Sequence, residues 1–215
     1  MSVMTQQQKI AVFGATGKVG SHFVEQALRA RYQVRVCIRN RAKLSQPIAQ
    51  KVEVFEGDAL NMADVEQAVA GVDFVVSCLG GTGKRPIMYT AYNNIMTAAA
   101  KQPQPPRCIM ISSVGLGGTS WLIKLMLTMI AGRATLADFE RADKRVREEV
   151  VVPFVLVRPY ALTDKPGNSR YHATQKQNAT FMRPISRADV ATFMVDAVAD
   201  RQWDGKLGVQ LGGAK

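Results

Sequence analysis

The residues whose types and spacing point most directly to chemistry are three glycines, Gly14, Gly17 and Gly20, which come just after the apolar run 10–13. Such a run predicts a buried strand, and the residues from Lys18 onward have the spacing of a helix. A glycine-rich turn brings bare backbone close to a ligand, and the helix N-terminus offers unpaired N–H groups with a partial positive charge. We therefore expect this turn to bind the pyrophosphate of a dinucleotide.

The glycine spacing is G-x-x-G-x-x-G rather than the commoner G-x-G-x-x-G, and a glycine triplet alone is a weak signal. Here the triplet follows a predicted strand, opens a predicted helix and begins a serial alternation of the two, which is the context of a dinucleotide site. The alternative is an ordinary tight turn between a strand and a helix. The residues expected to contact the cofactor here are Gly14, Thr16, Gly17, Lys18, Val19 and Gly20.

The residues after the second apolar run, 34–38, indicate which nicotinamide cofactor is preferred. An acidic side chain at this position would hold the ribose hydroxyls of NAD, but the stretch from Arg39 to Lys43 contains no carboxylate. The planar guanidinium of Arg39, together with Arg41 or Lys43, suits a 2′-phosphate. NADP(H) is therefore the expected cofactor, and the alternative is a solvated basic helix start.

Two further strand ends offer contacts to the adenosine half of the cofactor. Asp58 could accept a hydrogen bond from the adenine amino group, with Ala59 or Leu60 beside the ring, or it could instead be the N-cap of the next helix. Leu79 and Gly80 end the fourth predicted strand, where small residues let the backbone approach the ribose. The remaining expected cofactor contacts end the fifth and sixth strands, at Ser112 and Pro159.

Strand and helix patterns alternate along the whole chain. Predicted strands cover residues 10–13, 34–38, 52–55, 73–79, 108–112, 154–157 and 206–211. Predicted helices cover residues 18–31, 61–69, 87–100, 121–150 with a break near Gly132, and 187–199 after the N-cap Ser186. Strands joined by helices of this length form a right-handed, doubly wound parallel sheet. We expect residues 1–215 to form one Rossmann-type α/β domain, in which the loop-rich segment 160–185 caps the carboxyl edge of the sheet.

Taken in order, these motifs resemble those of atypical short-chain dehydrogenase/reductases, in particular the compact branch of NmrA-like regulators and flavin reductases of the biliverdin reductase B type. The motifs that carry the resemblance are residues 14–20, 39, 57–58, 79–81, 112–113, 157–159 and 185–191. The resemblance covers nearly the whole chain and implies a Rossmann fold that binds NAD(P). Since the branch contains both reductases and catalytically silent sensors, it implies no single reaction.

The resemblance also shows where this chain departs from the wider superfamily. Members that reduce a carbonyl usually carry a Tyr-x-x-x-Lys pair, in which the lysine lowers the pKa of the tyrosine and the tyrosine delivers the proton. In the aligned stretch, Lys144 matches the lysine and forms the K-x-x-x-E spacing with Glu148, whereas Glu140 stands at the tyrosine position. The standard acid is therefore missing from the sequence.

Several residues are candidates for the catalytic role. Ser113 stands where the superfamily's serine polarises the substrate, Tyr160 follows Pro159 close to the expected nicotinamide, and Lys144 is expected to contact the nicotinamide ribose. The alternatives are ordinary ones, because serines at strand ends often cap the backbone and a tyrosine there can simply pack. Further candidates are Tyr89, Tyr92 and His172.

Composition narrows the class of protein. The net charge of +11 would suit a nucleic-acid partner, but the basic residues are scattered and no RNA-binding aromatic motif accompanies them, so we expect none. The most apolar stretch, 121–131, is too short for a membrane-spanning helix, which needs about 20 residues. Three widely spaced cysteines form neither a disulfide framework nor a zinc pattern, so we expect core thiols, no metal site and a cytoplasmic setting. Monomer and homodimer stay equally open.

The sequence thus predicts an NADPH-dependent reductase that transfers hydride to a small conjugated acceptor, such as a flavin, a tetrapyrrole, a quinone or an enone-type metabolite. A flavin reductase needs no strong protein acid, because solvent or a weak donor supplies the proton and the protein mainly orients the reactants. The competing hypothesis is a non-catalytic NADP(H)-binding redox sensor, which the missing tyrosine favours.

Overall fold

The computed structural model describes residues 7–80, 86–113, 116, 128–129, 132–175, 183–205 and 208–214. The strands are β1 (Lys9–Phe13), β2 (Gln33–Ile38), β3 (Glu53–Glu56), β4 (Phe74–Ser77), β5 (Arg107–Ile111), β6 (Phe154–Pro159), β7 (Leu162–Thr163), β8 (Tyr171–Thr174), β9 (Ile185–Ser186) and β10 (Val209–Gly213). The helices are α1 (Lys18–Arg29), α2 (Gln46–Ala49), α3 (Met62–Val69), α4 (Met88–Ala100), α6 (Arg133–Arg147) and α7 (Arg187–Ala199), with short 3-10 turns η1 (Arg41–Lys43) and η2 (Arg201–Trp203).

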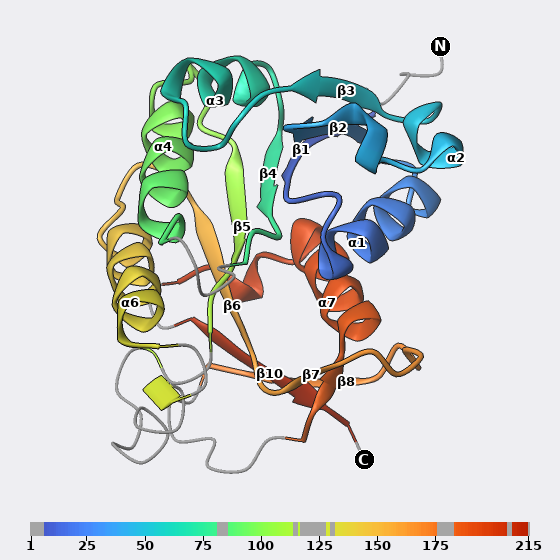
Figure 1. Ribbon diagram of the computed structural model, residues 1–215, viewed down its shortest axis with the longest axis vertical. Helices are drawn as coiled ribbons and strands as arrows, with labels where there is room; N and C mark the ends of the chain where they lie inside the picture. Colours follow the sequence, from blue (N-terminus) through green and yellow to red (C-terminus); the bar gives the residue numbers. More distant parts are fainter. Residues whose placement is uncertain are drawn as a thin grey trace.

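One sheet runs through the molecule in the order β3-β2-β1-β4-β5-β6-β10-β8 (Figure 1). All neighbours in it are parallel except β8, which pairs antiparallel with β10. The strand order reverses direction between β1 and β4, and at such a switch point the loops beyond the carboxyl ends of the strands form a crevice. The predicted doubly wound parallel sheet is confirmed, with a small pair of β7 and β9 beside it.

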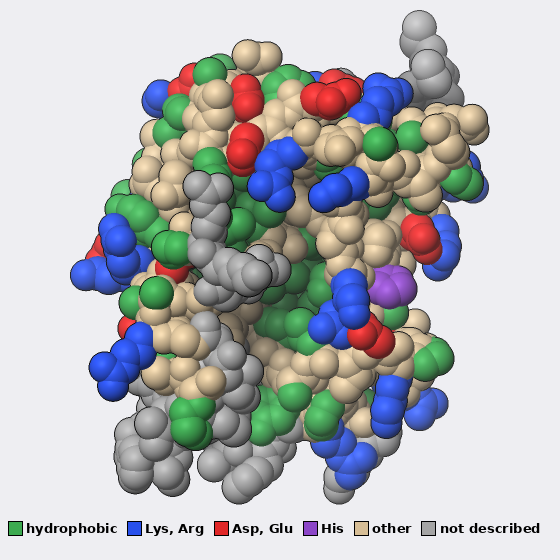
Figure 2. Space-filling view, viewed as in Figure 1, with side chains coloured by type: hydrophobic (Ala, Val, Ile, Leu, Met, Phe, Trp, Pro, Cys, Tyr) green, Lys and Arg blue, Asp and Glu red, His purple; other side chains and the backbone are tan. Residues whose placement is uncertain are grey.

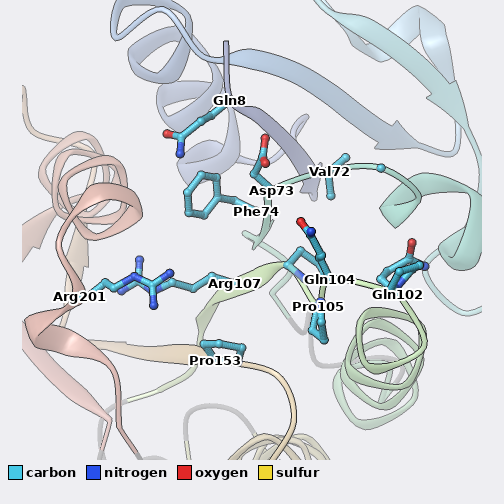
Figure 3. A pocket seen from close by; sticks show the side chains of 13 residues that line it. Gln8, Val72, Asp73, Phe74, Gln102, Gln104, Pro105, Arg107, Pro153 and Arg201 are labelled. Carbon is cyan, nitrogen blue, oxygen red and sulfur yellow. The ribbon is translucent and has the colours of Figure 1, made fainter. Parts of the chain in front are cut away.

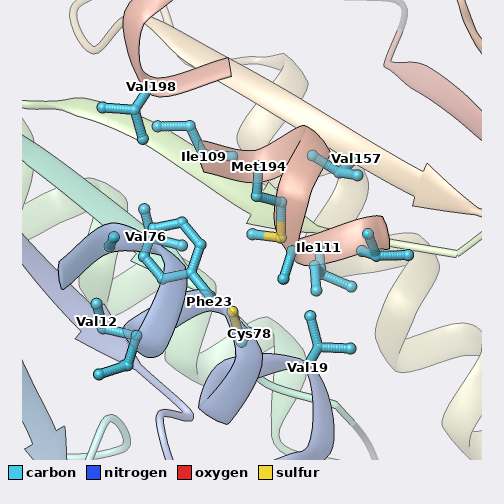
Figure 4. Close-up of a cluster of buried hydrophobic side chains, with 14 of the residues drawn as sticks. Val12, Val19, Phe23, Val76, Cys78, Ile109, Ile111, Val157, Met194 and Val198 are labelled. Carbon is cyan, nitrogen blue, oxygen red and sulfur yellow. The ribbon is translucent and has the colours of Figure 1, made fainter. Parts of the chain in front are cut away.

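Helices cover both faces of the sheet because successive strand residues point to opposite sides. In β1, Ile10 and Val12 join one hydrophobic cluster with residues of α1 and α7, whereas Ala11 and Phe13 join a second cluster with residues of α3, α4 and α6. Figure 4 shows the first cluster, in which Phe23 of α1 lies among side chains of the sheet. The two helix layers hold the strand ends, and therefore the loops beyond them, in fixed positions.

Several local expectations differ from the structure. The first helix ends at Arg29 rather than at residue 31, because Arg31 adopts a positive φ of 65° that a helix cannot continue. Segment 160–185, predicted as loop, contains β7, β8 and the first residue of β9; β8 lies at a sheet edge, where its residues need no regular apolar alternation. The predicted break near Gly132 is confirmed, since this residue has φ +81° and directly precedes α6. Most of the helix predicted before it, 121–127, and residues 206–207 lie outside the described residues.

Candidate cofactor and active site

The glycine turn after β1 brings three backbone segments into contact. A Cβ added to Gly14 would lie 2.8 Å from the carbonyl carbon of Cys78 at the end of β4, and the φ of Gly14 is +78°. A Cβ on Gly20 of α1 would lie only 2.1 Å from the carbonyl oxygen of Gly14. Gly17 is the N-cap of α1, so no N-cap side chain accepts a hydrogen bond from the first N–H groups of the helix. The first turn of α1 also contains no acidic residue. The residues present therefore fit a pyrophosphate, which needs bare backbone and an uncapped helix N-terminus.

A cavity of about 100 Å³ lies beside this turn, between the carboxyl ends of β1, β2, β3 and β4. Its walls combine apolar side chains with a few polar groups, as small-molecule sites commonly do. Six of the residues predicted to contact the cofactor line it: Gly14, Thr16, Arg39, Asp58, Ala59 and Leu79. The structure therefore gathers, in one place, residues that are up to 65 positions apart in the sequence.

Asp58 is held in the wall of this cavity by its own turn. Its Oδ1 accepts a hydrogen bond of 3.0 Å from the backbone N–H of Leu60, whereas the N-cap of α3 is Asn61. The N-cap alternative for Asp58 is therefore wrong. The neighbouring carbonyl of Ala59 accepts a hydrogen bond of 3.1 Å from the buried amide of Asn94. Because both residues are fixed before any ligand arrives, the wall is preorganised.

The basic residues after β2 lie on the surface at the rim of the cavity. Arg39 is exposed and contributes to the cavity lining, while Lys43 is exposed within η1 and does not line it. Among the described residues that line the cavity, Asp58 is the one carboxylate. Figure 2 shows Lys and Arg side chains above and to the right of a hollow with a hydrophobic floor, which lies between α1 and α7 on one side and α4 and α6 on the other. This arrangement suits an anionic ligand with flat apolar rings.

Lys18, at the first position of α1, forms an ion pair with Asp164 from the segment after β7. The Lys18 Nζ lies 2.8 Å from one carboxylate oxygen of Asp164, and a guanidinium nitrogen of Arg187 lies 2.6 Å from the other. The hydrogen bond from Lys18 and the charge of Arg187 lower the pKa of Asp164, which is exposed. The segment after β7 is thereby tied to the N-termini of both α1 and α7.

The predicted catalytic residues lie in two different environments. Ser113 and Tyr160 are both half-buried; Ser113 is the second residue after β5, and Tyr160 directly follows the neighbouring strand β6. The backbone N–H of Tyr160 donates to the carbonyl of Leu211. Lys144 lies on α6 with its side chain 69% exposed and pairs with Glu148 at 3.7 Å. The fold therefore brings Ser113 and Tyr160 to the same edge of the sheet and turns Lys144 toward solvent.

The other two tyrosine candidates are engaged elsewhere. Tyr92 is almost fully buried, and its hydroxyl donates to the carbonyl of Ile111. Burial raises the pKa of Tyr92 well above its usual range. The ring of Tyr89 lies 4.1 Å beneath the guanidinium carbon of Arg141. His172 is exposed on the edge strand β8.

A buried polar cluster behind the ends of β5 and β6 was not foreseen. The Ser112 hydroxyl donates to Asp143 at 2.8 Å, and Arg158 reaches both oxygens of the same carboxylate at 3.0 and 2.8 Å. Any contact of Ser112 with a cofactor is therefore expected from its main chain. One sequence signal was available, namely a charged residue at 143 between the apolar helix positions Ala142 and Val146.

A larger cavity of about 680 Å³ opens at the opposite, amino-terminal edge of the sheet (Figure 3). It is lined by the Pro-rich loop 102–106 and by side chains including Asp73, Arg107 and Arg201. None of the predicted cofactor contacts lines it, and the Arg107 guanidinium is already bonded to Asp204 and to carbonyls of α7. Its size therefore does not mark it as the cofactor site.

The cysteines, possible metal ligands and possible membrane-spanning helices were also compared with the expectations from the sequence. The three cysteines Cys37, Cys78 and Cys108 are free and buried, which confirms the expected core thiols. Within the described ranges, no three His, Cys, Asp or Glu side chains are grouped so that they could hold a metal ion. In the same part of the chain, no helix has both the length and the apolar character needed to cross a bilayer.

Known proteins share both sequence and fold with this chain. The model of the NAD(P)H-binding family matches residues 14–201. Protein TIC 62, chloroplastic, of Oryza sativa subsp. japonica is 25% identical over 182 residues, covering 70% of this chain and 34% of the rice protein. The chain therefore spans about a third of the length of that relative.

Two solved structures superpose closely on the fold. ChuY, an anaerobilin reductase from Escherichia coli O157:H7, is 24% identical with a TM-score of 0.79, covering 97% of this chain and 98% of ChuY. A short-chain dehydrogenase/reductase from Veillonella parvula DSM 2008, in complex with NADP, is 18% identical with a TM-score of 0.79, covering 95% and 94%. The two structures share the fold, and the family model that matches residues 14–201 shows that the chain belongs to the NAD(P)H-binding family, in keeping with its resemblance to atypical short-chain dehydrogenase/reductases.

Proposed function

We propose that the protein is an NADPH-dependent reductase that transfers hydride to a small conjugated acceptor. The observation that carries this proposal is the cavity in which Arg39 lies together with Gly14, Thr16 and Asp58. It combines a phosphate-binding turn with a guanidinium at the ribose position, where NAD-specific proteins carry a carboxylate. The NADP complex of the Veillonella parvula relative supports the same cofactor here.

The preference for NADPH over NADH rests on one exposed guanidinium. Hydrogen bonds to a charged group contribute about 1.5–3 kcal/mol each, and a solvated site favours the lower end of that range. A loss of about 1.5 kcal/mol corresponds to roughly a tenfold change in Kd. Since NADH has no 2′-phosphate, its affinity is expected to be insensitive to Arg39.

The test compares Arg39→Gln with Arg29→Gln, which removes the same charge from an exposed position on α1 where Arg29 pairs with Glu25. Calorimetry at fixed salt is expected to show the Kd for NADPH raised at least tenfold by R39Q, with the Kd for NADH changed less than twofold. R29Q should leave both values within twofold. Equal loss of NADPH and NADH binding in R39Q would contradict the assignment of Arg39 to the 2′-phosphate.

For the reaction, NADPH supplies a hydride when bound, and the acceptor gains that hydride and one proton. The residues we propose to face the acceptor are Ser113 and Tyr160, because they follow adjacent strands at the edge where the crevice opens. We assign no step to Lys144, since its side chain is mainly in solvent and paired with Glu148. The hydrophobic floor of the hollow in Figure 2 suits a flat acceptor such as a flavin, a tetrapyrrole or a quinone, and ChuY, which shares the fold, is a reductase.

The second candidate function is a redox sensor that binds NADP(H) without turnover. The absence of a Tyr-x-x-x-Lys tyrosine and the outward position of Lys144 favour it. Steady-state NADPH oxidation with a panel of flavins and quinones separates the two functions. Turnover above a protein-free blank supports the reductase, whereas tight NADPH binding with no turnover across the panel supports the sensor.

A further inference from the structure

The end of β5 and the end of β6 each replace an apolar residue by a polar one on the same face of the sheet. Ser112 and Arg158 continue, at a spacing of two, rows of buried side chains that pack toward α4 and α6. These rows are Cys108 and Met110 on β5, and Phe154 and Leu156 on β6. Both polar side chains therefore enter the layer between the sheet and α6 rather than the crevice.

Asp143 of α6 receives both of these side chains. Its Oδ1 accepts from the Ser112 hydroxyl at 2.8 Å and from Arg158 Nη2 at 3.0 Å and Nε at 3.2 Å. Its Oδ2 accepts from Arg158 Nη2 at 2.8 Å and from Arg147 Nε at 2.8 Å. Asp143 and Arg158 are each only 1% exposed. The Asp143 carboxylate thus accepts hydrogen bonds from three side chains, those of Ser112, Arg147 and Arg158.

Stability alone gives little reason for this arrangement. A buried ion pair is often no more stabilising than apolar side chains of the same volume, because desolvation offsets the attraction. Yet the slot is shaped for the arginine: a Cβ added to Gly208, just before β10, would lie 2.9 Å from the Arg158 guanidinium carbon. The backbone of the neighbouring segment therefore leaves room for a charge that the fold does not need for its core.

We propose that Asp143 and Arg158 are positioning residues for the acceptor site, an inference that rests on the proposed reductase function. The carboxylate clamps Ser112, and so fixes the backbone that carries Ser113. Arg158 is two residues before Tyr160 and clamps the adjacent strand end to the same group.

The experiment uses Asp143→Asn, which keeps the shape and removes the charge, with FMN as the probe acceptor. The expected result is a fall in kcat of at least thirtyfold, with the Kd for NADPH and the KM for FMN within threefold of wild type. The matched control is Arg145→Gln, which removes a different ion pair of α6, that between Arg145 and Glu149. This control should lower stability with kcat within twofold, so that a merely structural effect is separated from positioning.

Two further outcomes complete the test: a D143N variant that does not fold, and a wild-type protein that reduces none of the acceptors. If D143N does not fold, Ser112→Ala removes only the hydroxyl contact; an approximately tenfold fall in kcat with unchanged NADPH affinity supports the inference, and an unchanged kcat overturns it. If wild type turns over neither FMN nor the quinone panel, the proposed function fails and this inference fails with it. A folded D143N with wild-type kcat overturns the inference and leaves the reductase function standing.

Discussion

Replacing Gly20 by alanine tests the close approach on which the cofactor turn depends. The new Cβ would lie 2.1 Å from the Gly14 carbonyl oxygen and 2.9 Å from the Cα of Ala15. A carbon and a carbonyl oxygen are in ordinary contact at about 3.3 Å, so α1 and the end of β1 must separate by about 1.2 Å. Overpacking of this kind typically costs about 1–3 kcal/mol, against a gain of about 1 kcal/mol from the better helix propensity of alanine.

The matched control is Ser21→Ala, one residue further along α1, where the side chain is exposed. Urea unfolding is expected to show Gly20→Ala less stable than S21A by up to about 2 kcal/mol, which is the overpacking cost less the gain in helix propensity. Since the first N–H groups of α1 move with the helix, NADPH Kd by calorimetry should also rise at least tenfold in G20A alone. If G20A matched S21A in both stability and NADPH affinity, α1 would not approach Gly14 as closely as the structure has it.

Three shorter predictions follow from buried or capped groups. Burial raises the pKa of Cys37 and of Cys78 to about 12, and it also raises the pKa of Cys108. A disulfide reagent at pH 8 should therefore react rapidly with no thiol until the protein is unfolded. Rapid reaction of a thiol in the folded protein would refute this prediction. Although burial alone raises it, the pKa of Glu149 is lowered by hydrogen bonds from Val151, Arg145 and Val150. Wild type should therefore exceed Glu149→Gln in stability by about 1–2 kcal/mol above pH 4.3, with the difference fading as pH falls through the folded pKa; a pH-independent difference would argue against it. Asn61 caps the N-terminus of α3, so Asn61→Ala should lower the free energy of unfolding, measured with urea, by about 1 kcal/mol. An unchanged urea midpoint would contradict this role of Asn61.

Much of the cavity wall beside the glycine turn, where we propose that the cofactor binds, was predictable because its requirements are local. Gly14 and Gly20 are dictated by a turn of a few residues, and Arg39 by the end of one strand, so each leaves a mark on a short stretch of sequence. The parallel order of β1 to β6 was predictable for a related reason, since each connection contains a helix or a long crossover. These features need no knowledge of contacts between distant segments.

The surroundings of the proposed acceptor site were not predictable in the same way. The pairing of Asp143 with Arg158 depends on which face of α6 packs against β6, and no local sequence pattern predicts this. The same orientation of α6 places the side chain of Lys144 in solvent, although its spacing to Glu148 matches a family motif. Strand β8 was missed because an edge strand has one neighbour only, and its half-exposed residues show no clean alternation.

The position of β10 has a consequence for synthesis of the chain. This strand occupies an interior place between β6 and β8, although it comes after both of them in the chain. Until residue 213 has left the ribosome, β6, whose six residues are buried in the finished protein, has no partner on one side. An open apolar edge of that length is a template for association with other chains. A nascent chain interrupted before residue 209 should therefore aggregate rather than persist as a cofactor-binding fragment.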